Sequence, residues 1–294
     1  MDNNIENYKE YLKTKKLSSN TVSSYIYDIN SFYEYIRSNY SVEISETKKA
    51  QILTYLVNLQ KLGKSSSTIS RTISALKNFF EFLKREHIIS DNPAMSIHSP
   101  KQIKKIPVIL SEEEINELMQ LPDKSNFKGS RDSAILEFLY SSGIRVTELI
   151  NIKINDVNLN ASIVSIFSTN SDKERIVPLS NTSKSAIMIY INDFRKVKCK
   201  EENEYLFINI SGEPISRQSI WKILKYYENK MNLNRELSPQ ILRNSFAVHL
   251  LSHGADMRTV QELMGLASIA ATQNYLQNLD FKSLEVFKKT FPRA

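Results

Sequence analysis

Two stretches in the first third of the chain repeat apolar residues at intervals of three and four. They cover residues 21–37 and 68–86, and a serine-rich run stands in front of each one. This spacing places the apolar side chains on one face of an α-helix, and serine is a common cap for a helix N-terminus. With weaker stretches at 5–14 and 46–61, the sequence predicts about four helices in this part of the chain.

Residues 88–107 interrupt the helical pattern. They contain three prolines and three lysines and show no apolar period, which is typical of a linker between domains. At 294 residues, the chain is long enough for about two domains. We therefore expect a helical domain over residues 1–87, a basic linker over 88–107 and a second domain over 108–294.

The second domain combines helical stretches with a short β-prone region. Ser111 begins a capping box in front of one helix, a further helix ends at Gly143, and Asp256 caps a third. Two short β-prone runs within residues 161–180 fit a hairpin. The predicted fold class is mainly α with a small β-sheet, and the remaining helices are expected at 181–197, 216–230, 239–252, 268–277 and 280–290.

The positive charge of the chain is concentrated on its N-terminal side. The formal net charge is +7. Residues 1–107 hold 16 Lys and Arg against 10 Asp and Glu, whereas residues 108–294 hold 23 Lys and Arg against 22 Asp and Glu. Lysine and arginine that neutralise phosphates supply the sequence-independent part of nucleic-acid binding. This asymmetry indicates a nucleic-acid partner, and a solvated basic surface is the alternative.

The composition excludes several other classes of protein. A single cysteine, Cys199, rules out an internal disulfide framework and a cysteine-based zinc site, and four histidines leave little material for a metal cluster. No stretch has the ~18 apolar residues of a membrane span, and the N-terminus is acidic and polar, unlike a signal peptide. We expect a cytoplasmic protein without a metal, a cofactor or a membrane partner.

Three segments of the second domain contain residues suited to phosphate chemistry. Arg145 lies one helical turn before Glu148, just after a glycine. Arg243 lies near the start of a predicted helix, and Tyr275 ends the segment that follows this helix. Taken singly, each residue has an ordinary structural explanation, such as an i,i+3 surface pair for Arg145 and Glu148.

Together, in this order and spacing, the three segments resemble those of the tyrosine recombinase (phage integrase) family, and most closely its bacterial Xer type. The resemblance covers nearly the whole chain and includes the runs NYKEYLKTKKLSSNTVSSYIYDI, DKERIVPLS, ISRQSIWK and FPRA. It implies a helical, SAM-like core-binding domain and an α+β catalytic domain that form a C-shaped clamp on duplex DNA. It also implies a tetramer on two duplexes, formed with itself or with a second recombinase, in which a helix at 280–290 contacts the next protomer.

The chemistry that this resemblance implies is metal-free phosphoryl transfer. A tyrosine attacks a DNA phosphate, which gives a 3′-phosphotyrosine and a free 5′-hydroxyl, and the hydroxyl of the partner strand reverses the step. Tyr275 matches the nucleophile, and Arg145 and Arg243 match the two arginines that bind the phosphate. Guanidinium groups suit this role because they bind an oxyanion through two donors and stay charged at any relevant pH.

Four positions depart from the family pattern. The lysine of the β-hairpin turn, which protonates the leaving 5′-oxygen in the family, is Asn170 here, and three histidine-type positions are Gln240, Asn244 and Leu266. Asparagine and glutamine donate hydrogen bonds but deliver no proton, and leucine does neither. Lys173, three residues beyond the turn position, is a candidate substitute for the missing lysine.

The basic first domain and the linker supply the side chains that we expect to contact DNA phosphates. They are Lys15, Lys16, Lys64, Arg71, Lys77, Lys101, Lys104 and Lys105.

Two functions remain open from the sequence. The retained Arg145, Arg243 and Tyr275 favour a site-specific recombinase that cuts and rejoins DNA, with strand cleavage slowed by the replaced positions. The replaced positions themselves favour a DNA-binding paralogue that has lost most strand cleavage and acts as a partner or regulator.

Overall fold

The computed structural model describes residues 3–15, 17–100, 106–168, 174–199 and 203–278. The chain forms two compact units, Met1–Lys104 and Lys105–Ala294. Most of the segment predicted as a linker therefore belongs to the first unit. The C-shaped clamp stays a prediction.

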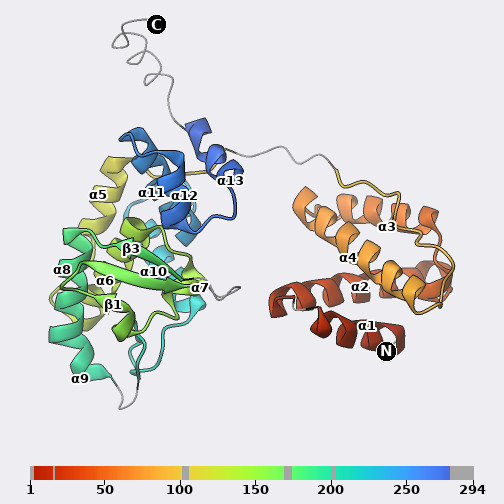
Figure 1. Cartoon of the computed structure of the whole chain (residues 1–294), viewed down its shortest axis with the longest axis horizontal. Helices are drawn as coiled ribbons and strands as arrows, with labels where there is room; N and C mark the ends of the chain where they lie inside the picture. Colours follow the sequence, from red (N-terminus) through yellow and green to blue (C-terminus); the bar gives the residue numbers. More distant parts are fainter. Residues whose placement is uncertain (1–2, 16, 101–105, 169–173, 200–202, 279–294) are drawn as a thin grey trace, which may run out of the picture. The chain divides into compact units, whose positions relative to one another are not determined.

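The described part of the first unit is helical, as the sequence predicts. Its elements are α1 (Asn3–Thr14), α2 (Ser19–Tyr40), the 3₁₀ helix η1 (Ile44–Glu46), α3 (Lys49–Lys61) and α4 (Ser66–Arg85) (Figure 1). Ser18 and Ser65 cap α2 and α4, and their hydroxyls accept hydrogen bonds from the N–H groups of Thr21 and Thr68 at 3.1 and 3.2 Å. These bonds satisfy N–H groups that have no partner within the helix.

Aromatic side chains make up much of the core of the first unit. Phe32 on α2 lies edge-on to Phe80 on α4, with ring centroids 6.2 Å apart, and both are fully buried. The buried Tyr8 donates a hydrogen bond to Oδ1 of Asn78 at 3.0 Å. Ile97 is also buried in this core, although its segment shows no apolar period. The stretch after α4 is therefore anchored to the helices.

The described part of the second unit is mainly helical and contains one small sheet (Figure 1). Before and within the sheet, its elements are α5 (Glu112–Gln120), α6 (Phe127–Ser142), α7 (Val146–Leu149), the 3₁₀ helix η2 (Ile154–Asp156), β1 (Val157–Asn158), β2 (Ile163–Phe167) and β3 (Glu174–Pro178). After the sheet they are α8 (Asn181–Ile189), the π-helix η3 (Tyr190–Arg195), α9 (Lys196–Lys198), α10 (Arg217–Lys230), α11 (Pro239–Ser252), α12 (Met257–Met264), α13 (Ile269–Gln273) and the 3₁₀ helix η4 (Asn274–Asn278). The helix expected at 280–290 lies outside the described residues.

The sheet consists of three antiparallel strands in the order β1-β2-β3, so it extends the predicted hairpin by one short strand. Val164 on β2 pairs with Val177 on β3, and both are buried, whereas Ile176 is exposed. Because side chains alternate along a strand, Arg175 shares the inward face of β3 with Val177. A charged residue therefore points into the second unit at this position.

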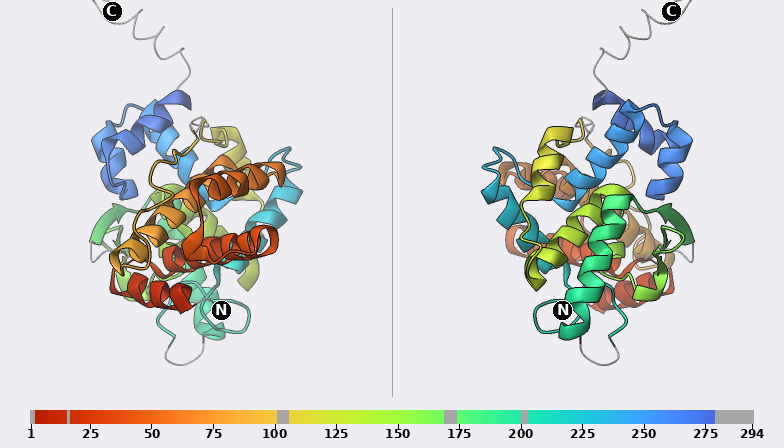
Figure 2. Two further views of the ribbon diagram at one scale, coloured as in Figure 1. Left: turned by 90° about the vertical axis from the view of Figure 1, so that its right-hand side faces the viewer. Right: turned by 90° about the vertical axis from the view of Figure 1, so that its left-hand side faces the viewer.

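Helix α11 is buried over most of its length. Leu242 packs in the larger apolar core of the unit, and Phe246 packs in a smaller cluster on the other half of the helix. Helix α11 packs against α6, which in turn lies beside α8 (Figure 2). Side chains on α11 are therefore held by neighbours on several sides.

Candidate active site

Arg145 stands in front of the short helix α7, directly after the turn that ends α6. Gly143 closes α6 with a φ of 54°, a left-handed conformation that glycine adopts without strain. Nη1 of Arg145 donates to Oε1 of Glu148 at 2.9 Å, and the backbone N–H of Arg145 donates to Oε2 at 2.9 Å. The pair is the expected i,i+3 contact, but the Glu148 side chain is only 1% exposed. The carboxylate of this pair is therefore buried, whereas the Arg145 side chain is 40% exposed.

Two guanidinium groups share the carboxylate of Glu148. Arg175 donates to Oε1 at 2.9 Å and to Oε2 at 2.8 Å, in addition to the bonds from Arg145. Burial raises the pKa of Glu148, but the hydrogen bonds and charges of Arg175 and Arg145 outweigh burial and hold the pKa below its usual value. The carboxylate stays ionised and fixes both arginines.

Arg243 occupies the first half of α11 and is 4% exposed. Its Nη1 donates to the carbonyl oxygen of Gly143, and its Nη2 donates to that of Met264 at 2.6 Å. Burial, followed by the nearby charge of Arg145, lowers the pKa of Arg243 to about 10. The guanidinium group therefore still carries its charge at neutral pH.

Three consecutive carbonyl groups at the end of α12 hold three guanidinium groups. The last carbonyls of a helix lack partners within the helix and carry the negative end of its dipole. This helix end therefore gathers three positive charges in one place. The donor and acceptor pairs are Arg175 Nε with Leu263 O (2.9 Å), Arg243 Nη2 with Met264 O (2.6 Å) and Arg145 Nη2 with Gly265 O (2.8 Å).

Tyr275 lies in η4 and is 7% exposed. It packs in the same apolar cluster as Phe246 and Met264. Burial raises the pKa of its phenol, and the charges of Arg243 and Arg145 oppose part of that rise. The two arginines and the tyrosine singled out from the sequence therefore come together in one region of the second unit.

The replaced family positions lie close to these residues where the structure describes them. Gln240 and Asn244 both lie on α11 and are hydrogen-bonded to each other at 2.8 Å, and Asn244 Nδ2 also donates to the carbonyl oxygen of Val108 at 3.1 Å. Leu266 packs against the cluster that contains Tyr275. Asn170 and Lys173 lie outside the described residues.

The expected phosphate-binding side chains of the first unit differ in their surroundings. Lys15 and Lys64 are exposed, and Lys77 is half-buried. Arg71 donates to both carboxylate oxygens of the buried Asp28, at 2.9 and 3.0 Å. An internal ion pair therefore occupies much of the donor capacity of Arg71. The other four candidates, Lys16, Lys101, Lys104 and Lys105, lie outside the described residues.

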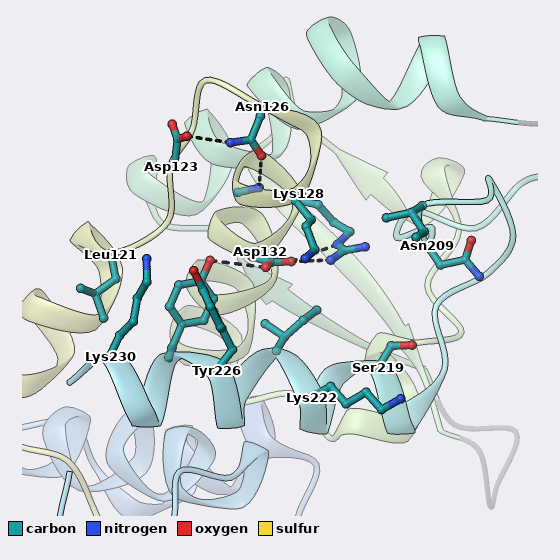
Figure 3. Close-up of a pocket in the computed structure, with 15 residues that line it drawn as sticks. Leu121, Asp123, Asn126, Lys128, Asp132, Asn209, Ser219, Lys222, Tyr226 and Lys230 are labelled. Carbon is teal, nitrogen blue, oxygen red and sulfur yellow. Dashed lines mark hydrogen bonds and ion pairs between the residues drawn. The ribbon is translucent and has the colours of Figure 1, made fainter. Parts of the chain in front are cut away.

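A cavity of about 590 Å³ lies elsewhere in the second unit, between the start of α6 and α10 (Figure 3). Its lining includes the ion pair of Arg131 and Asp132 at 2.8 Å, and Tyr227 donates to the same aspartate at 3.3 Å. Lys128 and Lys230 also line it. The candidate arginine pair and the tyrosine do not line this cavity, so it is separate from their site.

The described part of the chain contains neither a candidate metal site nor a helix that could span a membrane. No three His, Cys, Asp or Glu side chains within it are grouped so that they could hold a metal ion. None of its helices is long and apolar enough to cross a membrane.

Comparisons with known proteins identify the family. The sequence model of the phage integrase family matches residues 109–281, and the model of the phage integrase N-terminal SAM-like domain matches residues 5–87. The chain belongs to the phage integrase family. Among its relatives in this family is tyrosine recombinase XerD of Staphylococcus haemolyticus, which is 38% identical over 296 residues and all of both chains. XerD of Oceanobacillus iheyensis is 38% identical over 99% of this chain and 98% of the relative.

Solved structures of this family share the fold. XerA recombinase matches all of both chains with 26% identity and a TM-score of 0.58. XerH site-specific recombinase, in a post-cleavage complex with a palindromic difH substrate, has a TM-score of 0.78 and 22% identity. That match covers 90% of this chain and 78% of XerH. The predicted fold class, a helical SAM-like domain followed by an α+β domain, is therefore confirmed.

Sequence reasoning did not assign a role to Arg175. The residue lies in the run Lys-Glu-Arg-Ile-Val-Pro-Leu, which contributes to the predicted hairpin and to the family resemblance but does not by itself indicate a partner for Arg175. The alternation of side chains along β3 could have indicated a role for Arg175. Val177 is buried, and Arg175 lies two residues before it, so both side chains are on the inward face of the strand. An inward-pointing arginine needs a buried partner, and Glu148 is that partner.

Proposed function

We propose that this phage integrase family member is a site-specific DNA recombinase of the Xer type, which cuts and rejoins duplex DNA through a 3′-phosphotyrosine on Tyr275. The relatives named XerD are tyrosine recombinases and match the full length of the chain. The observation that carries the proposed residue roles is the convergence of Arg145, Arg243 and Tyr275 in one region. This convergence supports phosphate chemistry because two charged guanidinium groups stand near a phenol.

In the proposed step, Oη of Tyr275 forms a bond to the phosphorus and the bond from phosphorus to the 5′-oxygen breaks. The phenol loses its proton to solvent, and the departing 5′-oxygen gains one. Arg145 and Arg243 stabilise the charge that grows on the non-bridging oxygens, because their fixed donors need no reorganisation at the moment of reaction. The new ester retains the energy of the phosphodiester, so rejoining needs no nucleotide cofactor.

Protonation of the departing 5′-oxygen is the part of this step that the chain supports least. In the family, a lysine on the hairpin turn delivers it, and this chain has Asn170 there and Lys173 three residues later. Loss of a general acid typically costs ~10²–10⁴-fold in rate. We therefore propose slow cleavage of ordinary DNA, with Lys173 or water as the proton source.

Duplex DNA and further protomers are the proposed partners. XerH binds a difH substrate in its solved structure, and the exposed Lys15 and Lys64 of the first unit supply positive charge for a DNA contact here. Phosphate contacts of this kind position the protein on the duplex and carry no sequence information. The tetrameric synapse on two duplexes is proposed from the family.

A suicide substrate tests the proposal. Duplexes that the protein retains from a randomised pool supply a binding site, and a nick beside the scissile phosphate lets the short fragment with the free 5′-hydroxyl diffuse away. Covalent adduct then accumulates and runs as a slow band on a denaturing gel. Wild type should form this adduct, and Tyr275→Phe should form none while binding the duplex equally well.

The contrasting result separates the two functions considered from the sequence. A protein that binds the selected site and forms no adduct with any substrate would be a DNA-binding paralogue. The full-length match to XerD recombinases favours the enzyme over this alternative.

A further inference from the structure

Arg175 joins three segments of the second unit. It belongs to β3, it binds Glu148 of α7 through Nη1 and Nη2, and it binds the carbonyl oxygen of Leu263 at the end of α12 through Nε. The first of these partners holds Arg145, and the second lies next to the carbonyl that holds Arg243. One side chain thus connects the supports of both candidate phosphate-binding arginines.

We propose that Arg175 is a positioning residue of the recombinase site, which holds Glu148 against Arg145 and fixes the end of α12 beneath both phosphate-binding arginines. This inference rests on the proposed function. Arg175 is assigned to support and not to the DNA phosphate, because Nε, Nη1 and Nη2 each already donate to Glu148 or to the carbonyl oxygen of Leu263. The Arg145 side chain is 40% exposed and is therefore more accessible to DNA than the Arg175 side chain, which is 13% exposed.

The contact between Arg175 and Gly265 supports this role. Gly265 closes α12 with a φ of 59°, and a Cβ at this position would stand 3.1 Å from Nη1 of Arg175 and 3.2 Å from its Cδ and Cζ. The guanidinium group therefore lies directly against the bare Cα of the residue whose carbonyl oxygen holds Arg145. A side chain at residue 265 would displace Arg175 by a few tenths of an ångström.

The electrostatics of Glu148 provide a signature of the positioning role. The charged groups that face its carboxylate are Arg145 immediately before α7, Arg175 on β3 and Arg243 on α11. Removing Arg175 takes away two hydrogen bonds and one charge but leaves the carboxylate buried. The pKa of Glu148 then rises, and a protonated Glu148 holds Arg145 less firmly.

The experiment compares Arg175→Gln and Arg175→Lys with wild type in the suicide-substrate assay, over a range of pH. Arg175→Gln should bind the duplex within threefold of wild type but form adduct about 10²-fold more slowly, because small displacements of catalytic groups cost about that much. Its rate should fall further as the pH is lowered and Glu148 takes up a proton. Arg175→Lys keeps the charge, so it should recover part of the rate and most of the wild-type pH profile.

The matched control is Arg258→Gln, which removes an exposed guanidinium of α12 that pairs with Glu262 at 3.2 Å. It should leave the adduct rate and its pH profile unchanged. Gly265→Ala should slow adduct formation more than Gly254→Ala does, because Gly254 also has a positive φ but a Cβ there would have no neighbour within 4 Å.

A direct measurement separates failure of this inference from failure of the proposed function. Carbon-13 NMR of labelled glutamate carboxyls reports the pKa of Glu148 whether or not DNA is cleaved. A raised pKa in Arg175→Gln with a smaller rise in Arg175→Lys supports the inference, even if wild type forms no adduct. An unchanged pKa overturns it, as does an adduct rate in Arg175→Gln equal to that of an active wild type. A loss of rate that is independent of pH and matched by lost duplex binding also overturns it, since that is ordinary unfolding.

Discussion

Gln240 donates a hydrogen bond from Nε2 to Oδ1 of Asn244 at 2.8 Å, one turn along α11. The resemblance to the family assigns these residues to two histidine-type positions, on either side of Arg243, and we propose that assignment here. Asn244 also donates to the carbonyl oxygen of Val108. The two amides therefore satisfy each other and the backbone, and the arrangement places no titratable proton donor at these positions.

Restoring histidines should raise the rate of cleavage. The triple variant Gln240→His, Asn244→His and Leu266→His introduces side chains that can donate a hydrogen bond to the phosphate and exchange a proton near neutral pH. Each missing transition-state donor typically costs ~10²–10³-fold, although such groups do not add. We expect adduct with ordinary DNA to form about 10²-fold faster, measured on denaturing gels. Tyr275→Phe in the same background should abolish the adduct, and an unaltered rate would contradict the assigned positions.

A substrate with sulfur in place of the bridging 5′-oxygen should bypass the missing lysine. A thiolate leaves without taking up a proton, so cleavage of this substrate needs no general acid. If Arg145, Arg243 and Tyr275 form a competent site, the wild-type protein should form adduct with the sulfur substrate at least ~10²-fold faster than with ordinary DNA. This factor is about the rate enhancement that a general acid provides. Equal rates on both substrates would show that leaving-group protonation does not limit cleavage.

The sulfur substrate also isolates the ionisation of Tyr275. Burial raises the pKa of this phenol, and the neighbouring arginines offset part of the rise. At neutral pH the phenolate is therefore a small fraction, and that fraction increases about tenfold per pH unit below the pKa. Adduct formation should accelerate with rising pH between about pH 7 and pH 9. A flat profile would mean that loss of the phenol proton does not precede the slow step.

Local sequence patterns predicted most helices of the fold but not the contacts that build the site. Ser18, Ser65 and Ser111 cap helices where the sequence places them, because capping depends on residues within one turn. Arg145 and Glu148 were paired correctly, but the burial of the Glu148 carboxylate and the contact of Arg145 with Gly265 were missed, because they depend on β3 and α12, which are distant in sequence. The third strand β1 has two residues, too few for a period-2 pattern.

The ion pair of Arg71 and Asp28 should contribute to the stability of the first unit. Arg71→Ala leaves the carboxylate of Asp28, which is 4% exposed, without its two guanidinium donors. Thr72 remains as a hydrogen-bond partner of Asp28. A buried polar group left unsatisfied costs about 1–3 kcal/mol, so urea unfolding should show a loss of up to that size. Burial already raises the pKa of Asp28, so the variant should recover stability as the pH falls and the carboxyl group becomes neutral. The double variant Arg71→Ala, Asp28→Ala should lose less than the two single losses combined, and strict additivity would contradict the coupling.

Lys64, unlike Arg71, is a candidate for DNA binding whose side chain is exposed. It lies between α3 and α4, and it belongs to the positive charge that is concentrated in the first third of the chain. If Lys64 contacts a DNA phosphate, Lys64→Ala should weaken binding of all duplex sequences about equally and reduce the slope of log K against log salt by about one. Lys13→Ala is the control, because Lys13 is already neutralised by Glu10 at 2.7 Å, and its slope should match wild type. Both variants should unfold at the wild-type urea concentration, since exposed lysines contribute little to stability. A salt slope that Lys64→Ala leaves unchanged would place the DNA on another face of the first unit.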